Sequence, residues 1–448
     1  MSEQLLLHGA FDRIFPSRFI SFTFPNPLPP SPPPRDDDDD SARCGYPSSL
    51  RVAVLDTPDP NPSPHPLVAA MLVPVGRHRD WIFSTFPGHL HLLLSAPSPL
   101  SRLILIGQPE SEPELKPYTR NDDPDPIARL QRSLLPLLLA LSPKPSFRGA
   151  ALPQTPPFLS YEDDVAAISP VDLLVGPVAG EMLVEDVRLD TGELRRRLRF
   201  KRAPNLVQSQ VRLVPDGGGG GGSGPTVLRA EAGSLAQPYL APMLAGLALW
   251  APASPSSVPS EVLCVGVGGG ALLTCLRRTF GFRVLGVEAD ETVVCVAKKH
   301  FGLAEDKMLR LRVGDGIELI RNGSFLDGFD VVMVDLDFAD GLNGVGAPPV
   351  EFVEKSVLLG AKSALRPAGI LVVNVIMPMD AGFYGRLVGA FGEVFEEVYE
   401  IDVGNGENYV LVAVVPSVGL VVNEKQRVFS DKLKQVGAEA YVHCTKRI

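Results

Sequence analysis

The sequence predicts an α/β protein with a Rossmann-like parallel sheet in its C-terminal half. Short apolar runs typical of strands alternate with helix-like segments from residue 262 to residue 415. The first run ends in a glycine-rich stretch, and acidic residues follow each of the next three runs. Such alternation implies a parallel sheet with helices on both faces, and ligands bind at the carboxyl ends of its strands. The sequence therefore predicts a nucleotide-type cofactor site there.

The first predicted strand covers residues 262–265 and leads into Gly266, Gly268 and Gly270. Glycine lets the chain turn sharply and brings backbone N–H groups close to a ligand. A helix is expected at residues 271–279, directly after this turn. We therefore assign these three glycines to cofactor binding.

The second strand, residues 283–287, delivers Glu288 to the same edge of the sheet, 22 residues after Gly266. A carboxylate in this place can accept both hydroxyls of a ribose. Gly266, Gly268 and Ala271 also satisfy the dinucleotide fingerprint in its G-x-G-x-x-A form, which would indicate NAD. The acids that follow decide between the two ligands.

Acidic residues end the third and fourth strands as well. Residues 309–313 lead into Asp315 and Gly316, and residues 329–334 lead into Asp335 and Asp337. This succession favours S-adenosylmethionine over NAD. Glu288 would hold the ribose, Asp315 the adenine amino group, and Asp335 would lie near the sulfonium, whose charge a carboxylate stabilises.

The rest of this domain continues the same pattern. A helix is expected at residues 350–365 and a fifth strand at 370–375. Asn374 at the end of this strand would face the acceptor substrate, although a capping amide explains it equally well. Runs at 398–403 and 409–415 would complete a seven-stranded sheet.

The chain divides into several predicted segments. A tract of prolines followed by five consecutive aspartates predicts disorder near the N-terminus. A small α+β accessory domain and two strands joined as a hairpin, 194–200 and 207–213, precede the cofactor domain. The segments are a disordered leader (1–47), an accessory domain (48–145), a β-rich hairpin region (150–215), a Gly-rich linker (216–233), the S-adenosylmethionine-dependent domain (234–416) and a helical tail (417–448).

Composition limits the partners and the location. The net charge of −10 argues against nonspecific binding to nucleic acid, and no apolar run is long enough for a membrane helix. The five cysteines lack metal-ligand spacing, which predicts no metal site and a reducing compartment. We expect a cytoplasmic location, although the first 23 residues leave plastid targeting open. Arginines between 195 and 202 form either a solvated strand face or a contact for an acidic partner.

The segment from 262 to 415 resembles the spermidine-synthase-like class I methyltransferases, and among them the C-terminal half of the elongation factor 1-alpha lysine and N-terminal methyltransferases. The resemblance rests on the motifs VGVGGG at 265–270, VEAD at 287–290, DG at 315–316, DLD at 335–337 and PPVEFVE at 348–354. Weaker similarity extends upstream to about residue 50. It implies a protein substrate, elongation factor 1-alpha, and a homodimer. It also implies that Gln208 contacts the cofactor, although a surface amide explains this residue equally well.

Two transfer reactions are compatible with such a site. Methyl transfer and aminopropyl transfer both need an unprotonated amine in line with the sulfur, and Asp335 or Asp337 would orient it or accept its proton. The aminopropyltransferase pattern keeps only its first acid, Asp335, and a tyrosine, Tyr239, in this chain. The loss of the other polar groups favours methyl transfer to a protein amine, because a polyamine would be desolvated without partners. A catalytically inactive cofactor-binding or scaffold protein is the third alternative.

Overall fold

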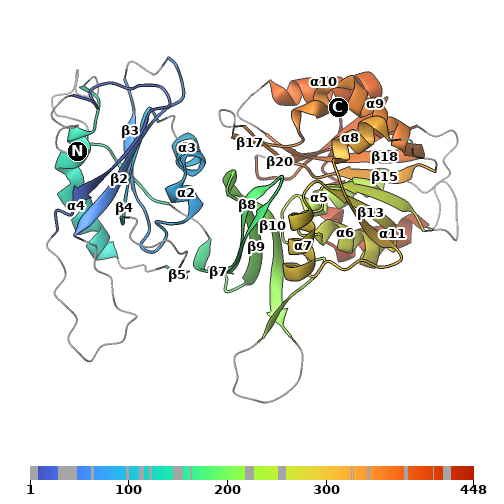
Figure 1. Cartoon of the computed structure of the whole chain (residues 1–448). Helices are drawn as coiled ribbons and strands as arrows, with labels where there is room; N and C mark the ends of the chain where they lie inside the picture. Colours follow the sequence, from blue (N-terminus) through green and yellow to red (C-terminus); the bar gives the residue numbers. More distant parts are fainter. Residues whose placement is uncertain are drawn as a thin grey trace. The chain divides into compact units, whose positions relative to one another are not determined.

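The chain forms two compact units (Figure 1), and each is described by itself. The first comprises residues 1–170 and 187–192, and the second comprises residues 171–186 and 193–448. The computed structural model describes residues 9–28, 48–61, 65–96, 100–109, 116–120, 124–144, 155–161, 164–216, 227–250, 259–323, 325, 327–340, 344–377, 382–406, 408–416 and 425–448. Most of the predicted Gly-rich linker lies outside these ranges.

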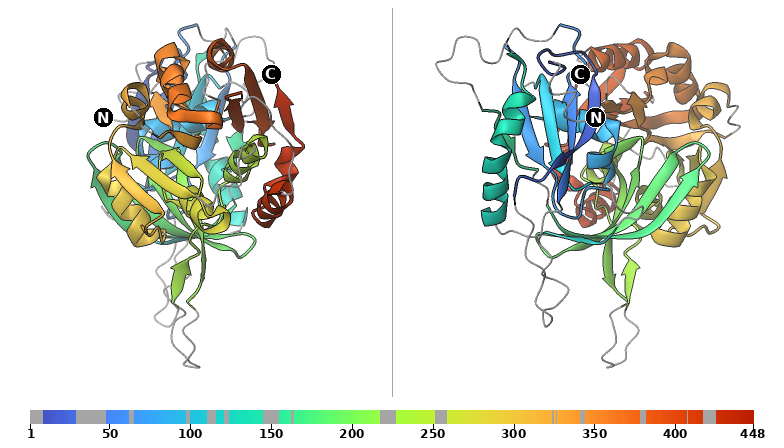
Figure 2. Two further views of the ribbon diagram at one scale, coloured as in Figure 1. Left: turned by 90° about the vertical axis from the view of Figure 1, so that its right-hand side faces the viewer. Right: turned by 60° about the vertical axis from the view of Figure 1, so that its left-hand side comes forward.

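The first unit is built on a five-stranded sheet. Its strands lie in the order β1 (Phe19–Pro25), β2 (Ser49–Asp56), β4 (Arg102–Gly107), β3 (Val68–Leu72) and β6 (Phe158–Leu159). Helix α4 (Pro124–Ala140) covers one face, while α2 (Trp81–Ser84) and α3 (Phe86–Leu94) cover the other (Figure 2). Side chains alternate between the faces along each strand, so both layers of the core draw on the same strands.

The prediction of a disordered leader is wrong for part of residues 1–47. Residues 19–25 form β1, which pairs antiparallel with β2, and Phe11 is buried in the core beneath α4. Ile20, Phe22 and Phe24 alternate with polar residues and pack against the same core. Composition averaged over the whole segment concealed this period-two pattern. The proline and aspartate tract lies outside the described residues.

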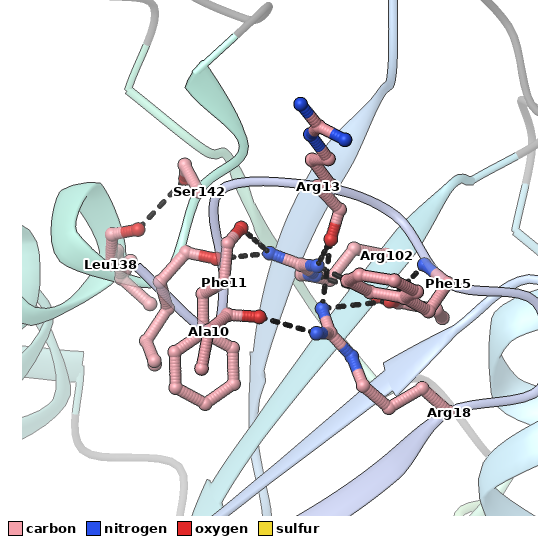
Figure 3. A network of polar contacts seen from close by, with 10 residues as sticks. Ala10, Phe11, Arg13, Phe15, Arg18, Arg102, Leu138 and Ser142 are labelled. Atoms are coloured by element: carbon pink, nitrogen blue, oxygen red, sulfur yellow. Dashed lines mark hydrogen bonds and ion pairs between the residues drawn. The ribbon is translucent and has the colours of Figure 1, made fainter. Parts of the chain in front are cut away.

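A buried arginine joins this N-terminal segment to the first sheet (Figure 3). Arg102 is fully buried, and its Nε donates to Asp56 Oδ1 at 2.6 Å. Its Nη1 donates to the carbonyl oxygens of Phe11 and Leu141 at 2.8 and 2.5 Å. Asp56 also pairs with Arg18, at 2.8 Å. Because a buried charge without partners is very costly, this network fixes residues 11–18 against the sheet.

We predict that Arg102→Ala destabilises the first unit by about 3–5 kcal/mol, because it leaves buried polar groups without their donor. The chain has two tryptophans, Trp81 in the first unit and Trp250 in the second, so Trp250→Phe makes Trp81 the reporter of the first unit. Urea denaturation followed by Trp81 fluorescence measures the effect. Arg120→Gln, which removes the exposed pair with Asp190, is the control and should cost less than about 1 kcal/mol. Equal shifts for both variants would contradict the assignment.

The second unit contains an eight-stranded sheet. Its order is β14 (Leu309–Val313), β13 (Arg283–Glu288), β12 (Glu261–Val265), β15 (Phe329–Val334), β18 (Leu365–Ile376), β20 (Asn408–Val414), β19 (Glu397–Asp402) and β21 (Thr445–Arg447). The first five strands are parallel, and the last three are antiparallel to their neighbours. The parallel part has the order 3-2-1-4-5, which confirms the predicted Rossmann-like fold.

The C-terminal tail corrects the predicted strand number from seven to eight. Residues 425–448 form α11 (Lys425–Gln435) and α12 (Glu439–Val442), as the helical prediction requires, but the chain then continues into β21. This strand pairs with β19 at the edge of the sheet. β21 has only three residues, and an alternating strand pattern cannot be recognised in so short a run.

Helices cover both faces of this sheet. On one face lie α5 (Leu240–Ala245), α6 (Ala271–Cys275) and α11, and on the other lie α8 (Gly316–Asn322), α9 (Lys355–Ala364) and α10 (Phe383–Val394). Alternate residues of β18 enter the two cores, with Val372 on the first side and Val373 on the second. No helix among the described residues is long and apolar enough to cross a membrane.

The predicted hairpin is present, within a second sheet of this unit. Strands β9 (Leu194–Phe200) and β10 (Ala203–Pro215) pair antiparallel around a turn at Lys201 and Arg202. β11 (Leu228–Ala230) borders β10, and β8 (Gly180–Leu189) and β7 (Val165–Gly176) follow beyond β9, with residues 180–186 and 171–176 of these two strands in this unit. Val293 and Val296 of α7 (Glu291–His300) pack against its apolar face. The hairpin is thereby held beside the carboxyl ends of the parallel strands.

Candidate functional site

A cavity of about 290 Å³ lies at the carboxyl ends of the parallel strands, within the second unit. This size is at the lower end of small-molecule sites, which start at about 300 Å³. Eight of the eleven residues predicted to form the site line it. They are Gln208, Tyr239, Gly266, Gly268, Glu288, Asp335, Asp337 and Asn374.

The glycine turn after β12 brings three strands close together. A Cβ atom on Gly266 would lie 2.0 Å from the carbonyl oxygen of Asp335, and one on Gly268 would lie 2.6 Å from Ser209 Oγ. The backbone N–H of Gly269 donates to the same Ser209 Oγ at 2.7 Å. Side chains at these positions would therefore displace β10 and β15 from the cavity.

Glu288 ends β13 with its carboxylate beside the glycine turn. The backbone N–H of Val267 donates to Oε2 at 3.1 Å, and that of Asp290 donates to Oε1 at 3.2 Å. Burial raises the pKa of Glu288 despite these hydrogen bonds. Each carboxylate oxygen keeps a lone pair for a further donor, so the group can accept from ligand hydroxyls.

Asp290 has a role that the sequence analysis did not assign. It caps α7 through Thr292, and its Oδ2 accepts from the backbone N–H groups of Val178 and Ala179 at 2.9 and 2.7 Å. Burial alone would raise the pKa of Asp290, but the hydrogen bonds from Ala179, Val178 and Thr292 outweigh it and lower the pKa. An aspartate directly before a predicted helix is an N-cap signal, so the cap was predictable but the tie to the β7–β8 turn was not.

Asp335 occupies the end of β15 and has two neutral partners. Tyr239 donates its hydroxyl to Oδ2 at 3.1 Å, and Asn374 donates its amide to Oδ1 at 3.0 Å. Burial raises the pKa of Asp335 to about 6, although both hydrogen bonds oppose the rise. Burial also raises the pKa of Tyr239, with Asp335 adding to the effect. The ionised carboxylate therefore has donors but no counter-charge among these partners.

Asp337, two residues further on, is paired with a cation. Arg202 Nη1 lies 2.8 Å from its Oδ2, and Arg202 Nη2 donates to its Oδ1 at 3.1 Å. Gln208 adds a longer hydrogen bond to Oδ2, at 3.4 Å. Arg202 is a residue of the site that the sequence analysis grouped with the arginine patch. The two acids predicted to act alike thus have different environments.

Three of the predicted residues do not line the cavity. Asp315 is exposed and caps α8, accepting from Ile317 and Glu318. A Cβ on Gly316 would lie 2.2 Å from Val265 Cγ1, so this glycine is required for packing. Gly270 precedes α6 with a φ of 78°. The predicted contacts of these residues with the cofactor stay predictions.

Most of the arginine patch is neutralised within its own sheet. Four of its basic side chains each form an ion pair with an acid, at N–O distances of 2.5–2.8 Å. The pairs are Arg195–Glu193, Arg196–Asp186, Arg199–Glu185 and Lys201–Glu181. They support the interpretation as a strand face rather than as a contact for an acidic partner.

The lining residues fit S-adenosylmethionine. Glu288 lies beside the backbone of the glycine turn, where it would accept from ribose hydroxyls, and Asp335 would provide a negative charge for a sulfonium. Among the described residues, no group of three or more His, Cys, Asp or Glu side chains is arranged to hold a metal ion.

Comparison with known proteins gives matches of two kinds. The human eEF1A lysine and N-terminal methyltransferase is 28% identical over 370 residues, which cover 77% of this chain and 50% of that protein. The chain therefore spans about half the length of the curated relatives it matches. It is similar to the eEF1A lysine and N-terminal methyltransferases. The resemblance that the motifs predict is thus confirmed. No protein-family model matches the chain.

Two further matches cover a smaller part of this chain. The polyamine aminopropyltransferase of Korarchaeum cryptofilum is 31% identical over 122 residues, which cover 26% of this chain and 35% of that protein. The crystal structure of human methyltransferase-like protein 13 in complex with SAH is 26% identical, with a TM-score of 0.39. It covers 45% of this chain and 92% of that chain.

The raised pKa of Asp335 predicts a pH-dependent cost to folding. Because the folded protein binds a proton here more tightly than the unfolded chain, stability falls as the pH rises from 3.8 to about 6. We predict that Asp335→Asn raises the melting temperature at about pH 7.5, and that the gain disappears towards about pH 4. Thermal unfolding across this range measures it. Asp431→Asn, on the exposed side of α11, is the control, and a gain that does not depend on pH would contradict the prediction.

Proposed function

We propose that the protein is an S-adenosylmethionine-dependent methyltransferase that acts on a protein amine. The observation that carries the proposal is the placement of Glu288 and Asp335 on either side of the glycine turn in one cavity. The similarity to eEF1A lysine and N-terminal methyltransferases over 77% of the chain supports the same reaction class.

When bound, S-adenosylmethionine supplies a methyl group on a positively charged sulfur. Glu288 would hold the ribose, and the glycine turn would let the cofactor approach the backbone. Asp335 would compensate the sulfonium charge from its buried position. The closely packed backbone around Gly266 fixes the separation of these two acids, so the chain provides a preorganised site rather than one formed on binding.

The acceptor amine must be unprotonated and aligned with the donor. A protein α-amine has a reference pKa of about 7.7–8.0, well below the 10.4 of lysine, so it needs little base catalysis. Asn374 is buried, and its Oδ1 has no hydrogen-bond partner among the described residues, while its Nδ2 donates to Asp335. This oxygen would accept an N–H of the incoming amine, and Tyr239 and Asp335 would complete the binding site on the same side.

We further propose the N-terminus of elongation factor 1-alpha as the acceptor, on the basis of the relatives' names. The cytoplasmic location and the homodimer remain predictions from the same resemblance. Aminopropyl transfer to a polyamine is the second candidate, because an archaeal aminopropyltransferase matches 122 residues of the chain.

We predict that the full chain binds S-adenosylmethionine more tightly than its decarboxylated form in calorimetric titrations. Glu288→Ala should weaken binding about a hundredfold, because hydrogen bonds to a charged group contribute about 1.5–3 kcal/mol each. Glu318→Gln, an exposed substitution on α8, should leave binding unchanged. Tritiated methyl should then be transferred to elongation factor 1-alpha with a free N-terminus and not to the N-acetylated protein. Preference for the decarboxylated cofactor, with transfer to a polyamine, would overturn the proposal.

A further inference from the structure

Arg202 lines the cavity and forms an ion pair with Asp337. It lies in the turn between β9 and β10, and its guanidinium contacts both oxygens of Asp337, at 2.8 and 3.1 Å. The side chains of Arg202 and Asp337 are 34% and 18% exposed, so the pair is partly withdrawn from water. The guanidinium carbon also lies 5.1 Å from the centre of the Phe200 ring. A bidentate, stacked arginine is held more firmly than a surface lysine would be.

The Arg202–Asp337 ion pair makes the two acids of the DLD motif differ, because Asp337 has a cationic partner and Asp335 has neutral ones. Among the described residues that line the cavity, Arg202 is the only lysine or arginine, and it is used by Asp337. Asp335 has only the neutral donors of Tyr239 and Asn374. The cavity therefore offers a ligand one acid without a counter-charge at this end, instead of two.

The number of uncompensated acids determines which amines can enter. A partly desolvated ammonium group needs a carboxylate partner, because burying a charge without one is costly. A polyamine carries two or more such groups and keeps at least one when its reacting amine is neutral. A protein α-amine presents one, and it is neutral when it reacts. With Asp337 already occupied, the second ammonium group of a polyamine would be desolvated beside the positive charge of Arg202.

We propose that Arg202 is a specificity-determining residue, which occupies Asp337 and thereby excludes polyamines from the acceptor site. This inference deepens the proposed methyl transfer to a protein amine and rests on it for its biological meaning. It predicts that the cavity does not bind polyamines, and this can be measured without any transfer reaction.

The experiment is calorimetric titration of putrescine and spermidine into the full chain and its variants. The wild-type protein should show no binding of either amine up to the highest concentration titrated. Arg202→Gln should bind both with a Kd at least about tenfold below that concentration, because it frees a partly buried carboxylate. The double variant Arg202→Gln with Asp337→Asn should lose the gain. Arg212→Gln removes an exposed pair between β10 and Glu231, which follows β11, and it should behave like the wild type.

Retained S-adenosylmethionine binding shows that Arg202→Gln still folds around the cavity. If that variant loses cofactor binding, Arg202→Lys takes its place, and it should keep polyamines excluded because it keeps the cation. The inference would be overturned if the wild type or Arg202→Lys bound polyamines. It would also be overturned if Arg202→Gln gained no polyamine binding, or if the gain survived the added Asp337→Asn substitution. If the polyamine pattern is as expected but no methyl is transferred to protein, the proposed reaction fails while the role of Arg202 stands.

Discussion

The site depends on one constraint, the passage of the Gly266 backbone against the backbone of Asp335. The N–H of Gly266 donates to Val287 on one side, and Val265 accepts from the N–H of Asp335 on the other, at 2.9 and 2.8 Å. A Cβ at Gly266 would lie 2.0 Å from the Asp335 carbonyl oxygen. Strands β12, β13 and β15 can therefore end side by side at the same edge of the sheet only because Gly266 lacks a side chain. The spacing between Glu288 and Asp335 follows from that contact.

Several carboxylates at one edge of the sheet repel one another, and each of them is stabilised by different partners. Asp290 is stabilised by backbone N–H groups, and Asp337 by the guanidinium of Arg202. Glu288 accepts from the backbone N–H groups of Val267 and Asp290, but burial still raises its pKa. Asp335 has no cationic partner in the part of the chain that the structure describes, and burial raises its pKa to about 6. The uncompensated charge is thus concentrated at Asp335, where a cationic cofactor or amine would relieve it.

The inner strands of the parallel sheet were predictable because β12, β15 and β18 are largely buried and appear as continuous apolar runs. Strands β14 and β15 have the predicted bounds, and the acids at the ends of β13 and β15 reach the cavity. Asp315 does not, since β14 lies at the edge of the sheet and the sequence pattern gives no strand order. Arg202 was missed for a related reason. Its contact with Asp337 spans 135 positions, and its basic neighbours along β9 suggested a surface patch.

The cavity is completed by a segment outside the Rossmann-like sheet. Ser209 of β10 accepts the N–H of Gly269, and Gln237 donates to the carbonyl oxygens of Val207 and Gln208, so the hairpin is fixed to the glycine turn by polar contacts. The parallel strands supply the acids that a sulfonium cofactor requires. The hairpin supplies the cation that determines how many of those acids stay available, through Arg202. The acceptor site therefore depends on both segments, because Asp335 follows β15 and Asn374 lies in β18, whereas Arg202 lies in the β9–β10 turn. A change in that turn would alter the acceptor site without disturbing the sheet.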